Sequence, residues 1–301
     1  MDPAALLETV RANWAAQHES EIEVVEVVQG PDGPLYVYGL DGGSRTDQSV
    51  VARDREGNVV WSDHATSEQI IEIYGDNTFF QIPCRVTHLR TCDMDGDGEI
   101  EIVAVYGHLR LYPGFVRIYA LDGEIVGAYY NYGRIGDVLV VDVEDDGRDE
   151  LLLLGTNNSK HFQSGTAILL DAEHRFGASS DPHGLADCPL PDDCRTRVVL
   201  PKFPEPVMEH FRGLRLWLRH PTFFRDENGE ALFTASLMLD QSTFLVIFDS
   251  ELRPTAIDPA DGAVSQAEAW PAEDQAFIRP ESLEEWVRGT HRFGASEAGG
   301  A

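Results

Sequence analysis

Short apolar runs, separated by glycine and aspartate residues, mark the central part of the chain. Ile102–Tyr106 and Leu151–Leu154 are unbroken apolar stretches that are too short for an ordinary helix. Downstream, segments such as Phe115–Val126 place apolar residues two apart and are interrupted by an Asp-Gly turn. The pattern predicts an all-β fold of short strands joined by tight turns.

The pattern repeats after 49 residues. Asp122 and Asp171 are separated by that distance, and each follows the second apolar run of its copy. Repeats of this length are units that cannot bury their apolar faces alone and must stack on their neighbours. We expect clear repeats at residues 84–132 and 133–178 and weaker ones at 20–68 and 208–258.

Each clear repeat contains a loop in which carboxylates alternate with other residues before a strand begins. Side chains at positions 1, 3, 5 and 9, with a carbonyl at position 7, form the oxygen cage that a hard cation such as Ca²⁺ requires. Glycine at position 6 permits the sharp turn that aims these oxygens at one point. The expected ligands of the first loop are Asp93, Asp95, Asp97, Glu101 and the Glu99 carbonyl. Those of the second loop are Asp142, Glu144, Asp146, Glu150 and the Arg148 carbonyl.

The two loops predict about two calcium ions, and we expect the second site to be weaker. Glu144 is longer than the aspartate at the matching position of the first loop, so its side chain must fold back to reach an ion. The flanking repeats do not keep the acid pattern. Asp226 and Asn228 begin a similar loop, but its ninth position is Thr234. We therefore expect no metal in either weaker repeat.

The closing position of the cage distinguishes these loops from EF-hands. An EF-hand lies between two helices and uses a bidentate glutamate at position 12, whereas position 12 here is Ala104 or Leu153, inside a predicted strand. A cage that closes at position 9 as a strand begins resembles the calcium loop of FG-GAP (VCBS) repeats. Those repeats are the blades of integrin-type β-propellers, and the resemblance covers the central third of the chain.

The resemblance implies a β-propeller of about four to five blades, built from four-stranded FG-GAP-like repeats over residues 20–258. A four-bladed ring, a ring with further blades hidden in residues 63–83 and 259–290, and an open arc remain alternatives. The segment Ser67–Tyr74 is either an insertion or an unusual strand.

The two ends of the chain do not follow the repeat. Apolar residues at helical spacing, among them Leu6, Val10 and Trp14, predict an N-terminal helix within residues 1–19. Residues 259–301 form a C-terminal extension in which Pro280–Val287 reads as a short helix capped by Ser282.

Charge and hydropathy restrict the partners. The chain has 52 acidic and 23 basic residues, a net charge of −29, so phosphate-rich partners such as nucleic acid and anionic membranes are repelled. Adaptation to high salt would give the same composition. No apolar run approaches the 18 residues of a membrane span. The first residues lack the pattern of a signal peptide, which predicts a cytoplasmic protein, whereas the resemblance implies an extracellular or periplasmic one.

The four cysteines form two pairs in the sequence, Cys84 with Cys92 and Cys188 with Cys194, and neither pair has the spacing of a metal site. The second pair lies in a proline-rich segment, where a small loop disulfide can form in an oxidising compartment. Four free thiols are the alternative. The thiol pattern therefore leaves the redox compartment open.

The sequence contains none of the HExxH, GxSxG, P-loop or dinucleotide-binding motifs. We therefore expect a non-catalytic module that binds a protein or a glycan. The alternative is a carbohydrate-active enzyme, because some polysaccharide lyases are built on similar calcium propellers. The resemblance implies that partners bind the face opposite the calcium loops. The candidate residues there are His108, Arg110, Tyr112, Asn157, Asn158, Lys160 and His161.

Overall fold

The computed structural model describes residues 21–30, 32–41, 49–74, 84–108, 113–158, 163–179, 192–210, 216–239, 242–260, 263–264, 267–268 and 270–293. These residues form four β-sheets, so the predicted all-β class is confirmed. The predicted N-terminal helix lies outside the described residues. None of the described helices is long and apolar enough to cross a membrane.

The first and fourth sheets are simple antiparallel meanders of four strands each. The first contains β1 (Glu21–Gly30), β2 (Gly33–Asp41), β3 (Ser49–Arg53) and β4 (Val59–His64). The fourth contains β14 (Trp217–Arg225), β15 (Ala231–Leu239), β16 (Ser242–Asp249) and β17 (Pro254–Pro259). These are the two weaker repeats of the sequence.

The second and third sheets have five strands each, and one strand of the third repeat pairs with the outer edge of the second sheet. The second contains β5 (Cys84–Cys92), β6 (Glu101–His108), β7 (Gly114–Tyr119), β8 (Ile125–Asn131) and β12 (Phe176–Ala178). The third contains β9 (Ile135–Val141), β10 (Glu150–Asn157), β11 (Ser164–Leu170), β13 (Thr196–Val199) and β18 (His291–Phe293).

This strand is β12, which follows β11 in the chain but pairs in parallel with β8 of the second sheet. The fourth position of the third sheet is then filled by β13, and β18 from the C-terminal extension pairs with β13. Both of these strands lie outside residues 133–178. They have only three or four residues each, so they left no repeat signal in the sequence.

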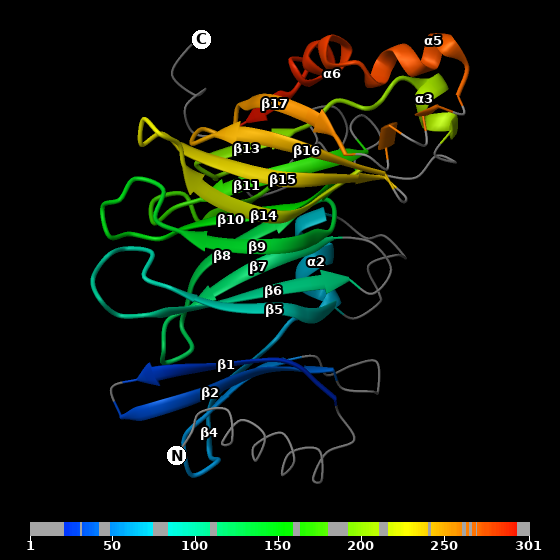
Figure 1. Cartoon of the computed structure of the whole chain (residues 1–301). Helices are drawn as coiled ribbons and strands as arrows, with labels where there is room; N and C mark the ends of the chain where they lie inside the picture. Colours follow the sequence, from blue (N-terminus) through cyan, green and yellow to red (C-terminus); the bar gives the residue numbers. More distant parts are fainter. Residues whose placement is uncertain are drawn as a thin grey trace, which may run out of the picture.

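The four sheets stack in chain order, with the first and the last at opposite ends of the stack (Figure 1). Val103 and Val105 of β6 pack with Leu151 and Leu153 of β10 in a core between the second and third sheets. All residues of β10 are buried. Burial on both faces explains why the strand reads as a continuous apolar run instead of an alternating one.

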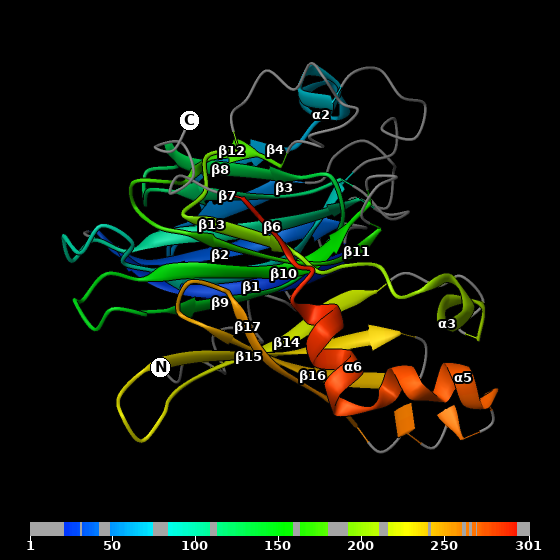
Figure 2. The same ribbon diagram turned by 90° about the horizontal axis from the view of Figure 1, so that it is seen from above.

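Helices lie at the periphery of this stack (Figure 2). Ser67–Tyr74 is an α-helix, α2, which buries Ile70 and Ile73 with residues of the first and second sheets. The helices of the last third of the chain are α3 (Glu205–His210), α5 (Ala272–Gln275) and α6 (Pro280–Val287), with a 3₁₀ turn at Ala276–Ile278.

The predicted helix Pro280–Val287 is confirmed, but Ser282 is not its cap. The N-cap is Arg279, and no side chain caps the helix. Pro280 starts the helix because its fixed φ suits the first helical position. Leu283 and Val287 are buried and hold α6 on the fourth-sheet core.

Two cysteines are described with their side chains, Cys92 and Cys194, and both are free and buried. Burial raises the pKa of each thiol well above its ordinary value. Buried protonated thiols behave as small apolar side chains. Cys188 and the side chain of Cys84 lie outside the described part of the structure.

Candidate functional site

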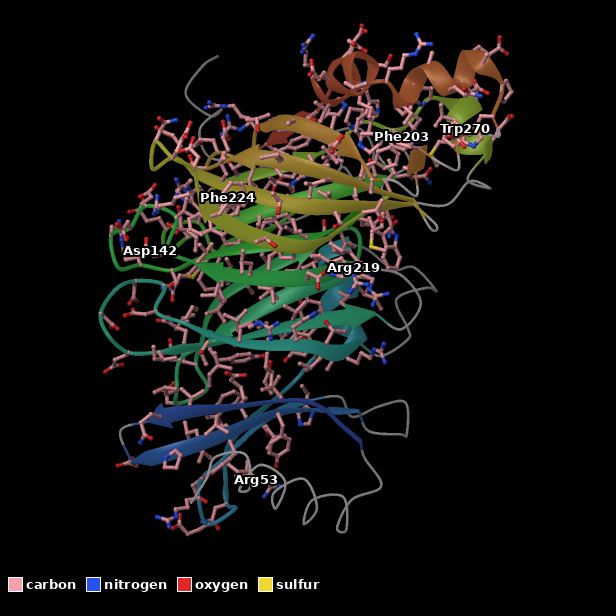
Figure 3. All side chains as sticks on the ribbon, viewed as in Figure 1. Arg53, Asp142, Phe203, Arg219, Phe224 and Trp270 are labelled. Atoms are coloured by element: carbon pink, nitrogen blue, oxygen red, sulfur yellow. The ribbon has the colours of Figure 1, made fainter. Side chains whose placement is uncertain are left out.

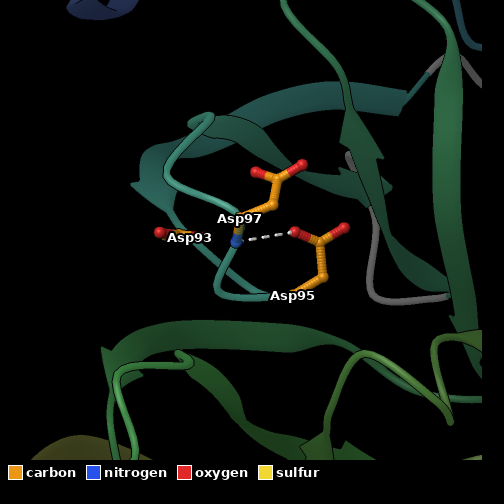
Figure 4. A group of neighbouring side chains, drawn as sticks. All are labelled: Asp93, Asp95 and Asp97. Carbon is orange, nitrogen blue, oxygen red and sulfur yellow. Dashed lines mark hydrogen bonds between the residues drawn. The ribbon is translucent and has the colours of Figure 1, made fainter.

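The first predicted calcium loop joins β5 to β6, and its backbone turns its carboxylates inward. Asp93 accepts a hydrogen bond from the Gly98 N–H at 3.1 Å, and Asp97 accepts one from the Glu99 N–H at 2.7 Å. Asp95 accepts a longer one, 3.4 Å, from the Asp97 N–H (Figure 4). As a result, carboxylate oxygens of Asp93, Asp95 and Asp97 lie within 4.8 Å of one another.

Asp93 has one oxygen that the protein does not satisfy. Its Oδ1 is buried and has no hydrogen-bond partner among the residues that the structure describes. A buried acceptor left in this state costs about 1–3 kcal/mol. The carboxylate of Asp93 lies near those of Asp95 and Asp97, an arrangement that a bound cation would stabilise.

Glu101, at position 9, is the most buried acid of the first loop. Its Oε2 accepts a hydrogen bond of 2.9 Å from the Met94 N–H, which fixes the side chain against the start of the loop. Burial raises the pKa of Glu101, and the negative charge of Asp95 adds to the effect. The structure thus brings together three predicted side-chain ligands and holds the fourth beside the loop backbone.

The second loop, between β9 and β10, has the same turn but a different electrostatic environment. Asp142 accepts hydrogen bonds from the N–H groups of Asp146 and Gly147, at 3.1 and 2.8 Å. Asp146 is held by its own neighbour, the Arg148 guanidinium, through bonds of 2.9 and 2.6 Å. Among the described residues, the acids of this loop do not gather into a group like that of the first loop.

Arg195 supplies a positive charge to the second loop. Its guanidinium lies 2.6 Å from Glu144, 3.3 Å from Glu150 and 3.6 Å from Glu251. Its side chain is only 17% exposed. Arg195 comes from the segment just before β13, 51 residues from Glu144, so the sequence pattern gave no reason to connect it with the loop.

Two hydrogen bonds between Asp93 and Asp149 join the two loops. The Asp93 N–H donates to Asp149 Oδ2 at 2.9 Å, and the Asp149 N–H donates to the Asp93 carbonyl at 2.9 Å. Gly96 adopts φ +73°, and a Cβ there would lie 2.7 Å from Arg148 Cγ. Glycine suits this position, because it adopts the positive φ without strain and leaves room for the Arg148 side chain.

The predicted partner-binding residues lie mostly outside the described residues. Arg110, Tyr112, Lys160 and His161 belong to those undescribed stretches, and His108 is described only as the backbone end of β6. Asn157 and Asn158 are buried. They therefore differ from the exposed recognition residues that the sequence led us to expect.

A group of charged residues, here called the basic cluster, lies at the start of β5, β9 and β14, which are the first strands of the second, third and fourth sheets. Asp142 lies at the opposite end of β9 (Figure 3). Its members are Arg85 and His88 of β5, Arg134 just before β9, Asp137 of β9 and Arg219 of β14. Arg219 Nε donates to Asp137 Oδ2 at 3.0 Å, and His88 Nε2 lies 3.8 Å from Asp137 Oδ1. Sequence reasoning missed this cluster because its residues come from three repeats.

Burial and neighbouring positive charges lower the pKa values of Arg134 and His88 in the basic cluster. Burial lowers the pKa of Arg134, and the neighbouring Arg219 and Arg85 lower it further. Burial also lowers the pKa of His88, while Asp137 opposes that change. The lowered pKa favours the neutral form of His88, and Asp137 is the acid that faces both His88 and Arg219.

Comparisons with known proteins identify no family for this chain. No protein-family model matches the sequence, and no curated protein is similar to it. Several solved structures resemble it at 10–11% sequence identity.

The similar structures include a Bacillus licheniformis rhamnogalacturonan lyase, with 11% identity and a TM-score of 0.44 over 82% of this chain and 53% of that protein. The Dos1 propeller has 10% identity and a TM-score of 0.44 over 77% of this chain and 46% of that one. A Phanerochaete chrysosporium exo-β-1,3-galactanase has 11% identity and a TM-score of 0.37 over 81% and 51%. The chain thus spans about half the length of these proteins, and its function has to be argued from its own residues.

Proposed function

We propose that this chain is a calcium-binding repeat protein of the FG-GAP (VCBS) type, with its four sheets arranged as propeller blades. Two observations carry the proposal: the carboxylates of Asp93, Asp95 and Asp97 lie close together, and Asp93 Oδ1 is buried without a hydrogen-bond partner among the described residues. Three carboxylates this close repel one another unless a cation lies between them. Calcium, a hard cation that accepts several oxygen ligands in flexible geometry, fits this donor set.

The proposed ligands are the three aspartates, the second oxygen of Glu101 and the Glu99 carbonyl. We propose one ion for the wild-type protein and not the two that the sequence pattern suggested. In the second loop, Arg195 already bridges Glu144 and Glu150. A divalent cation there would have to compete with a guanidinium that is held by three carboxylates.

Calorimetry with Ca²⁺ on metal-free protein tests the metal proposal. We expect binding of one ion below millimolar concentration, loss of that binding in Asp95→Ala, and weak competition by Mg²⁺, which prefers a smaller octahedral shell with retained waters. Asp226→Ala, in the turn of the fourth sheet, is the matched control and should bind like wild type. Failure of wild type to bind Ca²⁺ below millimolar concentration would refute the proposal.

We further propose that the calcium-stabilised scaffold binds carbohydrate through the basic cluster. Sugar hydroxyls both donate and accept hydrogen bonds, so a binding surface needs both kinds of group. Here Arg219 and Arg134 donate, Asp137 accepts, and the neutral His88 can do either. A glycan array with wild type and His88→Ala in calcium tests this proposal. Loss of binding in the variant supports it, whereas binding of a protein partner and of no glycan would replace it.

A carbohydrate-active enzyme is the second candidate function. The observation that favours it is the position of His88, since an imidazole near a carboxylate can act as a general base; its Nε2 lies 3.8 Å from Asp137 Oδ1 and its Nδ1 lies 3.0 Å from Thr87 Oγ1. Polysaccharide turnover, measured as release of new reducing ends, tests this. In an enzyme, His88→Gln should abolish turnover while substrate binding is retained. Binding without turnover by wild type would leave the non-catalytic module.

A further inference from the structure

Positive charge is scarce in this protein, yet it gathers at one place. The chain has 23 lysines and arginines against 52 acids. In the basic cluster, the positive charges of Arg85 and Arg219 act on Arg134, and the carboxylate of Asp137 acts on it in the opposite sense. Guanidinium groups this close repel one another, and an anion bound among them would offset that repulsion.

Asp137 is engaged by other partners and offsets the charge of Arg134 only in part. Its Oδ2 accepts hydrogen bonds from Arg219 Nε at 3.0 Å and from the His220 N–H at 3.1 Å, and its Oδ1 faces His88. Within the described part of the chain, the Arg134 guanidinium makes no ion pair with a carboxylate. It is a half-buried cation beside two others.

The protein positions Arg134 firmly. The carbonyl of Arg134 accepts a hydrogen bond of 2.9 Å from the Thr156 N–H. Gly155 packs so closely on this carbonyl that a Cβ would lie 1.9 Å from its oxygen. The guanidinium carbon lies 5.1 Å from the centre of the Trp217 ring. A guanidinium over a ring face keeps its edge N–H groups available for a planar, bidentate anion.

We infer that the basic cluster binds a carboxylate-bearing saccharide, with the Arg134 guanidinium as the anchor for the carboxylate. This inference rests on the proposed carbohydrate-binding function and adds the chemical class of the ligand. A carboxylate matches the planar edge of a guanidinium, and its single charge suits a small basic site. A densely charged phosphate polymer would instead be repelled by the net charge of −29.

Titration calorimetry in saturating Ca²⁺ tests the inference with oligogalacturonate and with the same oligosaccharide methyl-esterified. Wild type should bind oligogalacturonate at least about tenfold more tightly than the ester, since loss of one charge-assisted bidentate contact corresponds to about 1.4 kcal/mol or more. Arg134→Gln should lose that preference and bind both compounds equally. Arg134→Lys keeps the positive charge but cannot form the bidentate contact, so it should retain part of the preference for the acid over the ester.

Arg288→Gln serves as the control, because Arg288 is an exposed residue of the far helix α6. Melting temperatures of all variants in calcium establish that they are folded, and Arg219→Gln provides a second test should Arg134→Gln be unstable. Equal binding of the acid and its ester by wild type overturns the carboxylate inference alone. Binding of neither compound, nor of any neutral glycan, overturns the proposed carbohydrate function as well. Competition by inorganic phosphate and not by free galacturonate would also overturn the inference, in favour of a phosphate site.

Discussion

Asp93 and Asp142 occupy the same position of two similar loops, but their neighbours give them different chemistry. Asp93 lies near Asp95 and Asp97, and its own Oδ1 is buried without a hydrogen-bond partner among the described residues. The loop of Asp142 contains Asp146, bound to Arg148, and Glu144, bound to Arg195. The arginines Arg148 and Arg195 therefore make the electrostatic environment of the second loop different from that of the first.

The calcium dependence of stability should reside in the first loop. A ligand that binds only the folded state at about 100 times its Kd stabilises that state by about 2.7 kcal/mol. In Asp95→Ala we expect calcium to raise the melting temperature far less than in wild type, and in Asp226→Ala as much as in wild type. Thermal melts with and without Ca²⁺ measure this. Equal effects of the two substitutions would contradict the placement of the metal.

Replacement of Arg195 should uncover the second loop as a metal site. In Arg195→Gln the acids Glu144, Glu150 and Glu251 lose their shared cation. We expect the calcium-free protein to lose about 1.5–3 kcal/mol of unfolding free energy, the usual contribution of hydrogen bonds to charged groups. We expect calorimetry to give two Ca²⁺ per chain instead of one.

Arg253→Gln is the control for Arg195→Gln. Arg253 also pairs with an acid, Asp249, but at 3.6 Å and with 61% of its side chain exposed. Exposed pairs contribute about 0–1 kcal/mol, so the change should alter neither stability nor calcium stoichiometry. A single ion in Arg195→Gln with undiminished stability would show that Arg195 does not act as the cation of the second loop.

At the scale of elements, buried polar networks attach the outer parts to the central sheets. Arg117 of β7 is buried and forms an ion pair with Asp63 of β4, and its other nitrogen donates to Gln69 of α2 at 2.6 Å. Tyr119 also donates to Asp63, at 2.6 Å. Asp63 thus connects the first sheet to the second, and Arg117 connects both to α2.

Removal of that carboxylate should be costly. In Asp63→Ala the buried Arg117 would lose its counter-ion, and breaking a buried pair from one side costs about 3–5 kcal/mol. Asp54→Ala, in the turn between β3 and β4, is the control and should cost much less, because this carboxylate has no buried cation as its partner among the described residues. Urea denaturation of both variants gives the comparison. A loss below about 1 kcal/mol in Asp63→Ala would contradict the role assigned to the network.

At the scale of the whole molecule, the surplus of acids governs stability. With a net charge of −29, the folded chain concentrates negative charges that the unfolded chain holds further apart. Arg195 and the proposed calcium ion neutralise only a small part of that surplus. Stability should therefore depend on the salt concentration.

We expect the melting temperature of the calcium-free protein to rise as NaCl increases from about 0.01 M to about 0.15 M. Over that range the Debye length falls from about 30 Å to about 8 Å, which screens repulsion between exposed charges. KCl should have the same effect, because screening depends on ionic strength and not on the identity of the cation. A melting temperature that is constant or falls with salt would refute the repulsion argument.

The sequence by itself determined the features that depend on residues close together in the chain. The strands Glu101–His108 and Glu150–Asn157 follow from apolar runs, and the turn of the first loop follows from the spacing of its aspartates and Gly98. Both depend on local backbone geometry and on the periodicity of apolar side chains. For this reason the all-β class and the gathering of Asp93, Asp95 and Asp97 could be predicted.

Only the tertiary structure decided which distant residues complete each feature. Arg195 reaches Glu144 across 51 residues, and Arg219 reaches Asp137 across 82. The short strands β12, β13 and β18 join their sheets by pairing with distant edges. These contacts arise when sheets stack, so their energies depend on burial and on charges from other repeats, which no local pattern in the sequence records.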